Sequence, residues 1–211
     1  MMRLFSILLL TLTFTASLPA AAKVTPSERV KETVDKVLEI LKDESLEKSE
    51  RRSMVKTIVR SRFDYESMSQ VILAANWRKA TAAQREQFIT LFRELLEQTY
   101  YSAMDSYTNQ KVRMGRERLK GKLANVQTYI VASNKELPVS YKLRFRNDDW
   151  YAYDVAVDGV SLVSNYRTSF RNLVKTKGMD GLLAELAEKV ATLKSQNKKT
   201  VKQEAPEASV N

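Results

Sequence analysis

Two aspartates, three serines, a tyrosine and an arginine gather around a glycine in the stretch DVAVDGVSLVSNYRTSF, residues 154–170. Such residues could supply a carboxylate acid and base, with Asp154 and Asp158 as the candidates. A working pair would need two pKa values pushed apart, and no residue pattern here indicates that. Turn and cap chemistry accounts for most of the stretch, because Asp158-Gly159 is a strong turn signal and Ser164 can cap a helix. We therefore interpret it as a junction where a strand ends and a helix begins.

The composition removes most other catalytic chemistry. The chain has no Cys and no His. This excludes Cys/His zinc sites, Ser-His-Asp and Cys-His nucleophile systems, and imidazole acid-base catalysis. A carboxylate pair, a Ser-Lys arrangement or an oxygen-ligand metal site would remain for an enzyme, and none has a recognisable spacing here. We expect no enzymatic activity, no cofactor and no metal.

The N-terminus has the pattern of a secretory signal peptide. Arg3 precedes an uncharged apolar block, residues 4–18, and Ala20 and Ala22 occupy the small-residue positions of a cleavage site. The block is short for a transmembrane anchor. Residues 1–22 are predicted to be removed on export, and a bacterial periplasm fits best.

The mature chain is predicted to be one basic domain. Residues 23–193 can form a core, whereas the polar segment 194–211 is predicted to be a disordered tail. Without residues 1–22 the chain keeps 34 Lys and Arg against 25 Asp and Glu, a formal charge of +9. A basic exported protein suggests an acidic partner such as lipid headgroups, a membrane surface or another protein. Nucleic acid is not expected as a partner after export.

Helical patterns fill the first half of this domain. A capping box at Thr25 and Glu28 starts one helix, a second is predicted over residues 46–60, and Asp64 can cap a third. The strongest pattern begins at a second capping box, Thr81 with Gln84, and runs to about Ser106. Its apolar stripe predicts either ordinary core packing or the lining of a cavity: Phe88, Leu91, Phe92, Leu95, Leu96, Tyr100, Ala103 and Met104.

After Tyr107 the apolar period changes to two, which indicates strands. Segments 111–123, 126–131, 139–146 and 150–157 are predicted to form an antiparallel meander. Cations recur at intervals of two within three runs, which are Lys111 and Arg113, then Arg116, Arg118, Lys120 and Lys122, and finally Lys142, Arg144 and Arg146. They predict either a docking patch for acidic groups or a merely solvated face that discourages edge pairing.

Helical spacing returns after Ser164, with Gly178 as a predicted stop and a further helix over residues 179–193. The fold class is therefore predicted as α+β, with N-terminal helices, a curved antiparallel sheet of about four strands, and closing C-terminal helices.

Two long segments of this exported basic chain carry a family resemblance. They are RFDYESMSQVILAANWRKATAAQREQFITLFRELLEQTY, residues 62–100, and WYAYDVAVDGVSLVSNYRTSFRNLVKTKGMDGLLAEL, residues 150–186. Together they resemble the MlaC family of periplasmic phospholipid-binding proteins, also called toluene-tolerance or organic-solvent-resistance auxiliary components. The resemblance covers nearly all of the mature chain.

The resemblance implies an NTF2-like cone with an interior apolar pocket for acyl chains. It further implies a shuttle that carries glycerophospholipids between an outer-membrane lipoprotein-porin complex and an inner-membrane ABC transporter with a hexameric lipid-binding component. Such a shuttle maintains the lipid asymmetry of the outer membrane. The resemblance implies no cofactor, and it supplies no catalytic residue to transfer to this chain.

Physical chemistry requires a soluble carrier to enclose the lipid tails. Two acyl chains have about thirty methylenes, and at about 0.8 kcal/mol each their exposure would cost on the order of 25 kcal/mol. The predicted tail pocket consists of Phe88, Phe92, Leu95, Leu96, Met104, Val139, Tyr141, Leu143, Phe145, Val155, Val157, Tyr166 and Phe170. The predicted headgroup or partner-docking residues are Arg116, Arg118, Arg144, Arg146 and Arg167. A closed core would require the same apolar periods as a cavity.

Two other functions remain open at this point. One is a periplasmic chaperone or adaptor that holds other proteins by an apolar groove. The other is an exported hydrolase that uses the carboxylates of Asp154 or Asp158.

Overall fold

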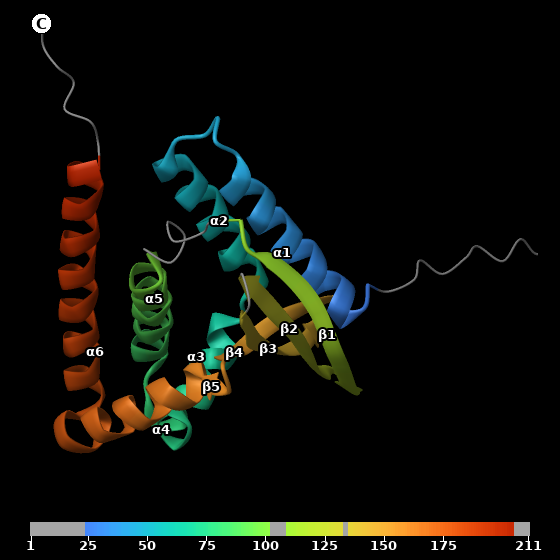
Figure 1. The fold of residues 1–211 in the computed structure, drawn as a ribbon. Coiled ribbons are helices and arrows are strands. Elements are labelled where there is room, and N and C mark those ends of the chain that lie inside the picture. Colours follow the sequence, from blue (N-terminus) through green and yellow to red (C-terminus); the bar gives the residue numbers. More distant parts are fainter. Residues whose placement is uncertain (1–23, 102–108, 133–134, 205–211) are drawn as a thin grey trace, which may run out of the picture.

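The computed structural model describes residues 24–101, 109–132 and 135–204 (Figure 1). The predicted signal peptide and Met104 lie outside these ranges. None of the helices in the described ranges is both long and apolar enough to cross a membrane.

Two antiparallel helices open the fold, α1 (Pro26–Lys42) and α2 (Lys48–Arg62). The predicted capping box of α1 is confirmed, because the Thr25 hydroxyl accepts from the Glu28 N–H while the Glu28 carboxylate accepts from the Thr25 N–H. α2 begins two residues later than predicted and ends at Arg62. At the next residue, Phe63, the chain becomes extended and bridges Ala152 in the sheet.

Three further helices follow: α3 (Tyr65–Leu73), α4 (Ala75–Lys79) and α5 (Ala82–Thr99). The Asp64 carboxylate caps α3, as predicted. α5 starts at a capping box formed by Thr81 and Gln84, which the sequence also indicated. It ends at Thr99, seven residues before the predicted end at Ser106.

The sheet has five antiparallel strands in chain order. They are β1 (Lys111–Lys120), β2 (Leu123–Ala132), β3 (Lys135–Arg146), β4 (Asp149–Val157) and the two-residue β5 (Val160–Ser161), which the prediction of about four strands did not include. Left-handed residues close the tight hairpins: Asn147 and Asp148 between β3 and β4, and Asp158 and Gly159 between β4 and β5.

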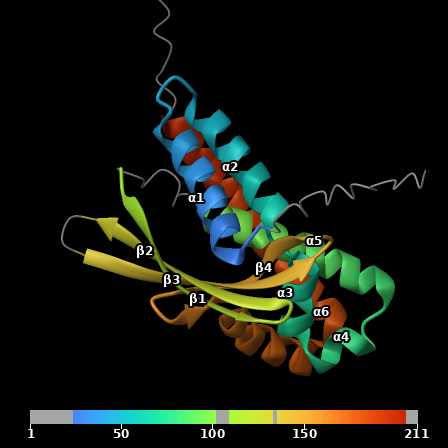
Figure 2. The same cartoon turned by 90° about the vertical axis from the view of Figure 1, so that its right-hand side faces the viewer.

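The two faces of the sheet differ in chemistry. We call inner the face that carries Leu143, which lies opposite Ala124 of β2 and Ala152 of β4. Val30 of α1 packs on this face. The outer face carries the alternate residues of β3, including Lys142, opposite Asp154 of β4. Figure 2 shows α1 and α2 on one side of the sheet and the first half of α6 on the other.

Helix α6 (Leu162–Glu204) closes the fold in two halves that meet at Gly178. Gly178 has φ 71° and ψ −174°, which confirms the predicted stop. The second half packs along α5 (Figure 1). It continues to Glu204, eleven residues beyond the predicted helix end at about residue 193. Polar contacts with α5 explain this extension: Lys194 Nζ lies 2.9 Å from Glu94 Oε2, and the Asn197 amide donates to the Gln98 carbonyl at 3.0 Å.

Candidate functional site

The stretch 154–170 forms a structural junction. Asp154 is buried on β4, and its carboxylate accepts from Lys142 Nζ at 2.8 Å, from the Ser161 hydroxyl at 2.7 Å and from the Val163 N–H at 3.2 Å. Three donors on β3, β5 and α6 therefore hold one carboxylate. This arrangement fixes the start of α6 to the sheet.

The cap of α6 is Ser161 rather than the predicted Ser164. The helix begins at Leu162, and the Ser161 hydroxyl accepts from the Ser164 N–H at 3.1 Å. The difference arises because the helix follows the short strand β5 directly: β5 ends at Ser161 and the helix begins at the next residue. The turn at Asp158 therefore lies closer to the helix start than the sequence suggested. Among the residues in the described ranges, no group of three Asp, Glu, Cys or His side chains could hold a metal ion.

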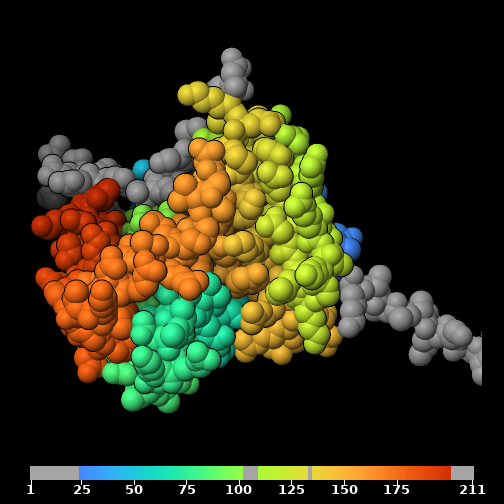
Figure 3. Space-filling view, turned by 90° about the horizontal axis from the view of Figure 1, so that it is seen from below, coloured from blue at the N-terminus to red at the C-terminus, as the bar shows by residue number. Residues whose placement is uncertain are grey.

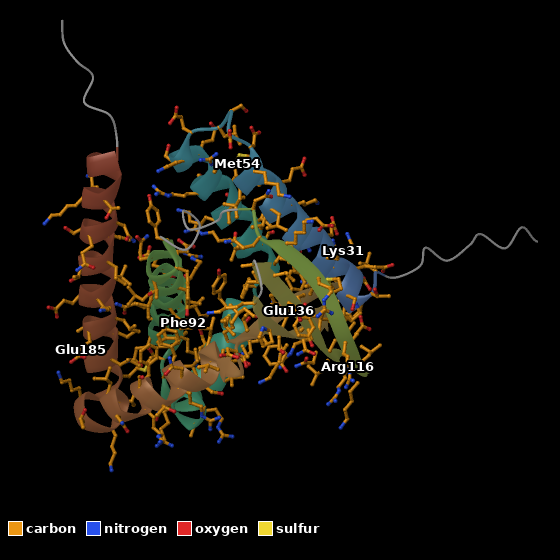
Figure 4. All side chains as sticks on the ribbon, in the orientation of Figure 1. Lys31, Met54, Phe92, Arg116, Glu136 and Glu185 are labelled. Carbon is orange, nitrogen blue, oxygen red and sulfur yellow. The ribbon has the colours of Figure 1, made fainter. Side chains whose placement is uncertain are left out.

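An aromatic cluster lies between α5 and the first half of α6. Tyr166 and Phe170 are four residues apart on one helical face, and their ring centroids are 5.4 Å apart. Phe92 contacts Tyr166 edge to face at 5.3 Å, and Phe88 contacts Phe170 in the same way at 5.8 Å. Figure 4 labels Phe92 on α5 within this cluster. We call the buried part of this cluster, together with the buried residues of α3, α5 and α6 around it, the helical core. Its members are Met68, Ile72, Leu73, Phe88, Phe92, Leu95, Leu96, Val163, Phe170, Leu182, Leu183, Leu186 and Val190.

A second apolar cluster lies between α1 and the inner face of the sheet. We call it the sheet core, and its buried members are Val30, Ala124, Val126, Leu143, Trp150 and Ala152. Tyr141 and Phe145 pack against it. The Phe145 and Trp150 rings lie 5.1 Å apart. The Trp150 indole N–H donates to the Val24 carbonyl at 3.1 Å, which joins the beginning of the domain to the sheet.

The predicted pocket residues are divided between these two cores. Phe88, Phe92, Leu95, Leu96 and Phe170 belong to the helical core and Tyr166 packs on it, whereas Leu143, Tyr141 and Phe145 belong to or pack on the sheet core. Val139 and Val155 are buried on the inner face but are members of neither core, and Val157 is 38% exposed. Met104 lies outside the described residues. The pocket residues of α5 and those of β3 therefore belong to different clusters, and neither cluster contains the predicted direct packing of β3 against α5.

The two cores meet at a residue that the sequence patterns did not single out. Phe63, at the end of α2, packs against both of them. Its ring also stacks on Tyr65 at 6.0 Å. A lone phenylalanine after a helix gives no periodic signal, so only the tertiary structure reveals this position.

Polar contacts also join α2 to α5. Arg60 forms a bidentate ion pair with Glu97, in which Arg60 Nη2 lies 2.8 Å from Glu97 Oε2. The buried Arg52 donates to the Tyr101 hydroxyl at 2.8 Å, and its guanidinium lies 4.4 Å from the centre of that ring. These contacts connect the N-terminal helices to the helical core.

Tyrosines in and around the cores remain neutral at physiological pH. Burial, together with the nearby Glu97 carboxylate, raises the pKa of Tyr65 to about 12. Burial also raises the pKa of Tyr141 and of Tyr166 above the ordinary tyrosine value. The apolar interior therefore gains no charge from these phenols.

The predicted docking residues lie on three elements. Arg116 and Arg118 are exposed on β1, and Arg167 is exposed on the first half of α6. Arg144 donates to the Ser67 hydroxyl at 3.1 Å, and Arg146 lies 3.5 Å from Glu66 Oε2, so both also tie β3 to α3. Figure 3 shows the strands β1 to β4, from lime to orange, on one face beside the orange start of α6.

Comparison with protein families gives one match over most of the chain. The model of the MlaC family, described as MlaC protein, matches residues 31–188. Among curated proteins, the chain is 25% identical over 193 residues to the intermembrane phospholipid transport system binding protein MlaC of Haemophilus influenzae. This match covers 86% of the chain and 90% of that protein. A toluene tolerance protein, ttg2D of Pseudomonas putida, is 28% identical over 148 residues, which covers 66% of this chain and 69% of that protein.

The fold also matches a solved structure. This is the phospholipid-binding protein from Ralstonia solanacearum in complex with a phospholipid. The TM-score is 0.71 at 25% sequence identity, and the match covers 78% of this chain and 96% of that one.

Proposed function

The chain belongs to the MlaC family, and from this premise we propose that it is a phospholipid carrier that moves glycerophospholipids between membranes. The likeness to a structure that holds a phospholipid is the observation that carries this proposal. The intermembrane transport protein matched over 90% of its length supports the same function. No chemical step is needed, since the carrier binds and releases its cargo unchanged.

We place the acyl tails between the helical core and the sheet core. Most of the predicted pocket residues belong to or pack on one of these two cores, and Phe63 packs against both of them. Val139 and Val155 extend the apolar inner face beyond the sheet core. Tails held there would leave water, whereas exposure of two chains would cost on the order of 25 kcal/mol.

The proposed place of action is the periplasm, after cleavage of residues 1–22. There the carrier would exchange lipid with an outer-membrane lipoprotein-porin complex and with an inner-membrane ABC transporter that has a lipid-binding hexamer. The sequence contains no Walker-type nucleotide loop, so we assign the direction of transport to these partners.

Lipid extraction tests the proposal. The full chain is expressed with its own N-terminus, purified from the periplasm without detergent, extracted with organic solvent and analysed by mass spectrometry. We expect stoichiometric glycerophospholipid. An empty, folded protein that also takes no phospholipid from vesicles would contradict a carrier, and copurifying peptides without lipid would favour a chaperone.

A pair of neighbouring substitutions locates the tails. Val139 is buried on the inner face, whereas Ser140 lies on the outer face. Val139→Trp should lower the ratio of lipid to protein because the indole occupies tail space. Ser140→Trp adds the same side chain on the other face and should leave the ratio unchanged. Equal ratios in both variants, with both folded by circular dichroism, would place the tails elsewhere.

A further inference from the structure

The outer face of β1 carries cations that the fold leaves without acidic partners. Among the described residues, Arg116, Arg118 and Lys120 form no ion pair, and all three are exposed. Other cations of the sheet differ: Arg113 pairs with Glu136 at 2.8 Å, and Lys142 pairs with Asp154 at 2.8 Å. The unpaired charge is thus concentrated on the edge strand.

The single acid of β1 does not neutralise this charge. Glu117 accepts from the Ser27 N–H at 2.8 Å, at the first turn of α1. It lies opposite Val126, a member of the sheet core, so it belongs to the inner side of the strand. Its carboxylate is therefore used to fix α1 to β1.

Apolar side chains are exposed where β1 turns into β2. Leu119 is 58% exposed and Leu123 is 42% exposed, and the turn between them contains Lys120 and Lys122. Gly121 takes a left-handed φ of 59° at this turn. Leu123 lies opposite Lys120 and shares the face of the cations, whereas Leu119 lies opposite Ala124 of the sheet core and belongs to the inner side. An exposed leucine beside lysines combines apolar area with positive charge, the combination that favours the boundary between headgroups and acyl chains.

We propose that the β1–β2 hairpin end, residues 116–123, docks on the surface of anionic phospholipid membranes. Arg116, Arg118 and Lys120 would face the headgroup phosphates, and Leu123, on the same face, would enter the apolar boundary. An acidic protein surface would satisfy the cations but would leave no role for the exposed Leu123. The proposal deepens the carrier function and rests on it, because docking would bring the carrier to membranes.

Helix α6 extends the same basic side of the molecule. Arg167, Arg171 and Lys175 recur every fourth residue along its first half, and all three are exposed. That half of α6 lies beside the outer face of the sheet in Figure 3. A planar anionic surface could therefore contact both elements.

Vesicle co-sedimentation tests the docking. The full mature chain is mixed with vesicles of phosphatidylethanolamine alone or with phosphatidylglycerol added, at low and high salt. The test variant is R116Q/R118Q/K120Q. The matched control is K189Q/K198Q/K199Q, which removes three exposed charges from the second half of α6. In Figure 4 this half, marked by Glu185, lies on the opposite side of the molecule from Arg116.

We expect the wild-type chain and the control to bind phosphatidylglycerol vesicles, with binding that weakens as salt rises. At about 1 kcal/mol for each cation, the test variant should bind about a hundredfold more weakly. L123S should bind about tenfold more weakly while keeping the salt dependence, because it removes only apolar area. L119S changes the inner side of the strand and should bind as wild type does.

Two results would overturn the docking proposal. One is wild-type protein that ignores phosphatidylglycerol vesicles, which would favour an acidic protein surface as the partner. The other is equal loss of binding in the test and control triples, which would mean that only net charge matters. The copurified lipid of R116Q/R118Q/K120Q is measured in parallel and should match wild type, so failure of docking is distinguishable from failure of the carrier function.

Discussion

At the scale of single residues, the carboxylate of Asp149 joins strand β4 to helices α1 and α2. This carboxylate accepts from Arg29 Nε of α1 and from Arg62 Nη1 of α2, each at 2.7 Å, and from the Trp150 N–H at 2.7 Å. Burial alone would raise the pKa of Asp149. The three donors outweigh it and hold the pKa of this carboxyl below its ordinary value of 3.8.

We predict that Asp149→Asn weakens the fold at neutral pH by about 1–3 kcal/mol, because two partly buried guanidinium groups lose their anion. The depressed pKa means that the carboxylate's contribution is complete above about pH 4 and is lost as pH falls through the folded-state pKa. Urea unfolding at pH 7 and at pH 2.5 measures both values. The difference between wild type and variant should shrink at the lower pH.

Asp35→Asn is the matched control for that measurement. Asp35 pairs with Lys31 at 2.6 Å, but both side chains are more than half exposed. Its loss should change the unfolding free energy by less than about 0.5 kcal/mol. An equal effect of the two substitutions would show that Asp149 acts only as a surface charge.

At the scale of elements, the sequence predicted the local boundaries best where a side chain determines them. The capping boxes at Thr25 and Thr81 and the cap at Asp64 were all found at the predicted residues. The start of α6 was missed by three residues, because Ser161 and Ser164 are both suitable caps and only the short β5 selects the first. The extension of α6 beyond residue 193 depends on contacts with α5, and such contacts cannot be predicted from the composition of one segment.

Gly178 shapes α6 through its backbone alone. A methyl group at this position would meet no atom within 4 Å, but φ 71° with ψ −174° is a conformation that only glycine adopts readily. We predict that Gly178→Ala lowers the unfolding free energy by about 1–3 kcal/mol. Urea denaturation followed by circular dichroism measures it. Asn172→Ala, an exposed change in the first half of α6, should stay within about 0.5 kcal/mol of wild type, and a similarly mild effect of Gly178→Ala would mean that the bend can move along the helix.

At the scale of the whole molecule, the structure adds what periodicity could not show. Phe88 and Phe92 on α5 have the apolar spacing of a core, and so do Tyr141 and Leu143 on β3. Each pair lies on the helix or strand that was predicted for it, yet the two pairs pack in different cores. Spacing defines which face of an element is apolar, whereas the partner of that face depends on how the chain connects the elements. The family resemblance supplied the function, because patterns alone fitted a closed core equally well.

The division into two cores also makes a kinetic prediction. If tails lie between the cores, lipid exchange requires α2 and α5 to separate, and a covalent tether between these helices should slow it. The chain has no cysteine, so Arg60→Cys with Glu97→Cys gives a unique pair for a cleavable thiol crosslinker. We expect the tethered protein to exchange fluorescent phospholipid with vesicles about tenfold more slowly, which corresponds to about 1.4 kcal/mol in the barrier.

The comparison is made within one variant, before and after cleavage of the tether, so the lost ion pair between α2 and α5 affects both measurements equally. Lys31→Cys with Asp35→Cys, tethered along α1 alone, is the control and should exchange at its untethered rate. Since that pair also replaces an ion pair, it matches the test in chemistry. Unchanged exchange after tethering α2 to α5 would mean that lipid leaves without separating these helices, and the route would then have to lie along the open end of the inner face, where Val157 is exposed.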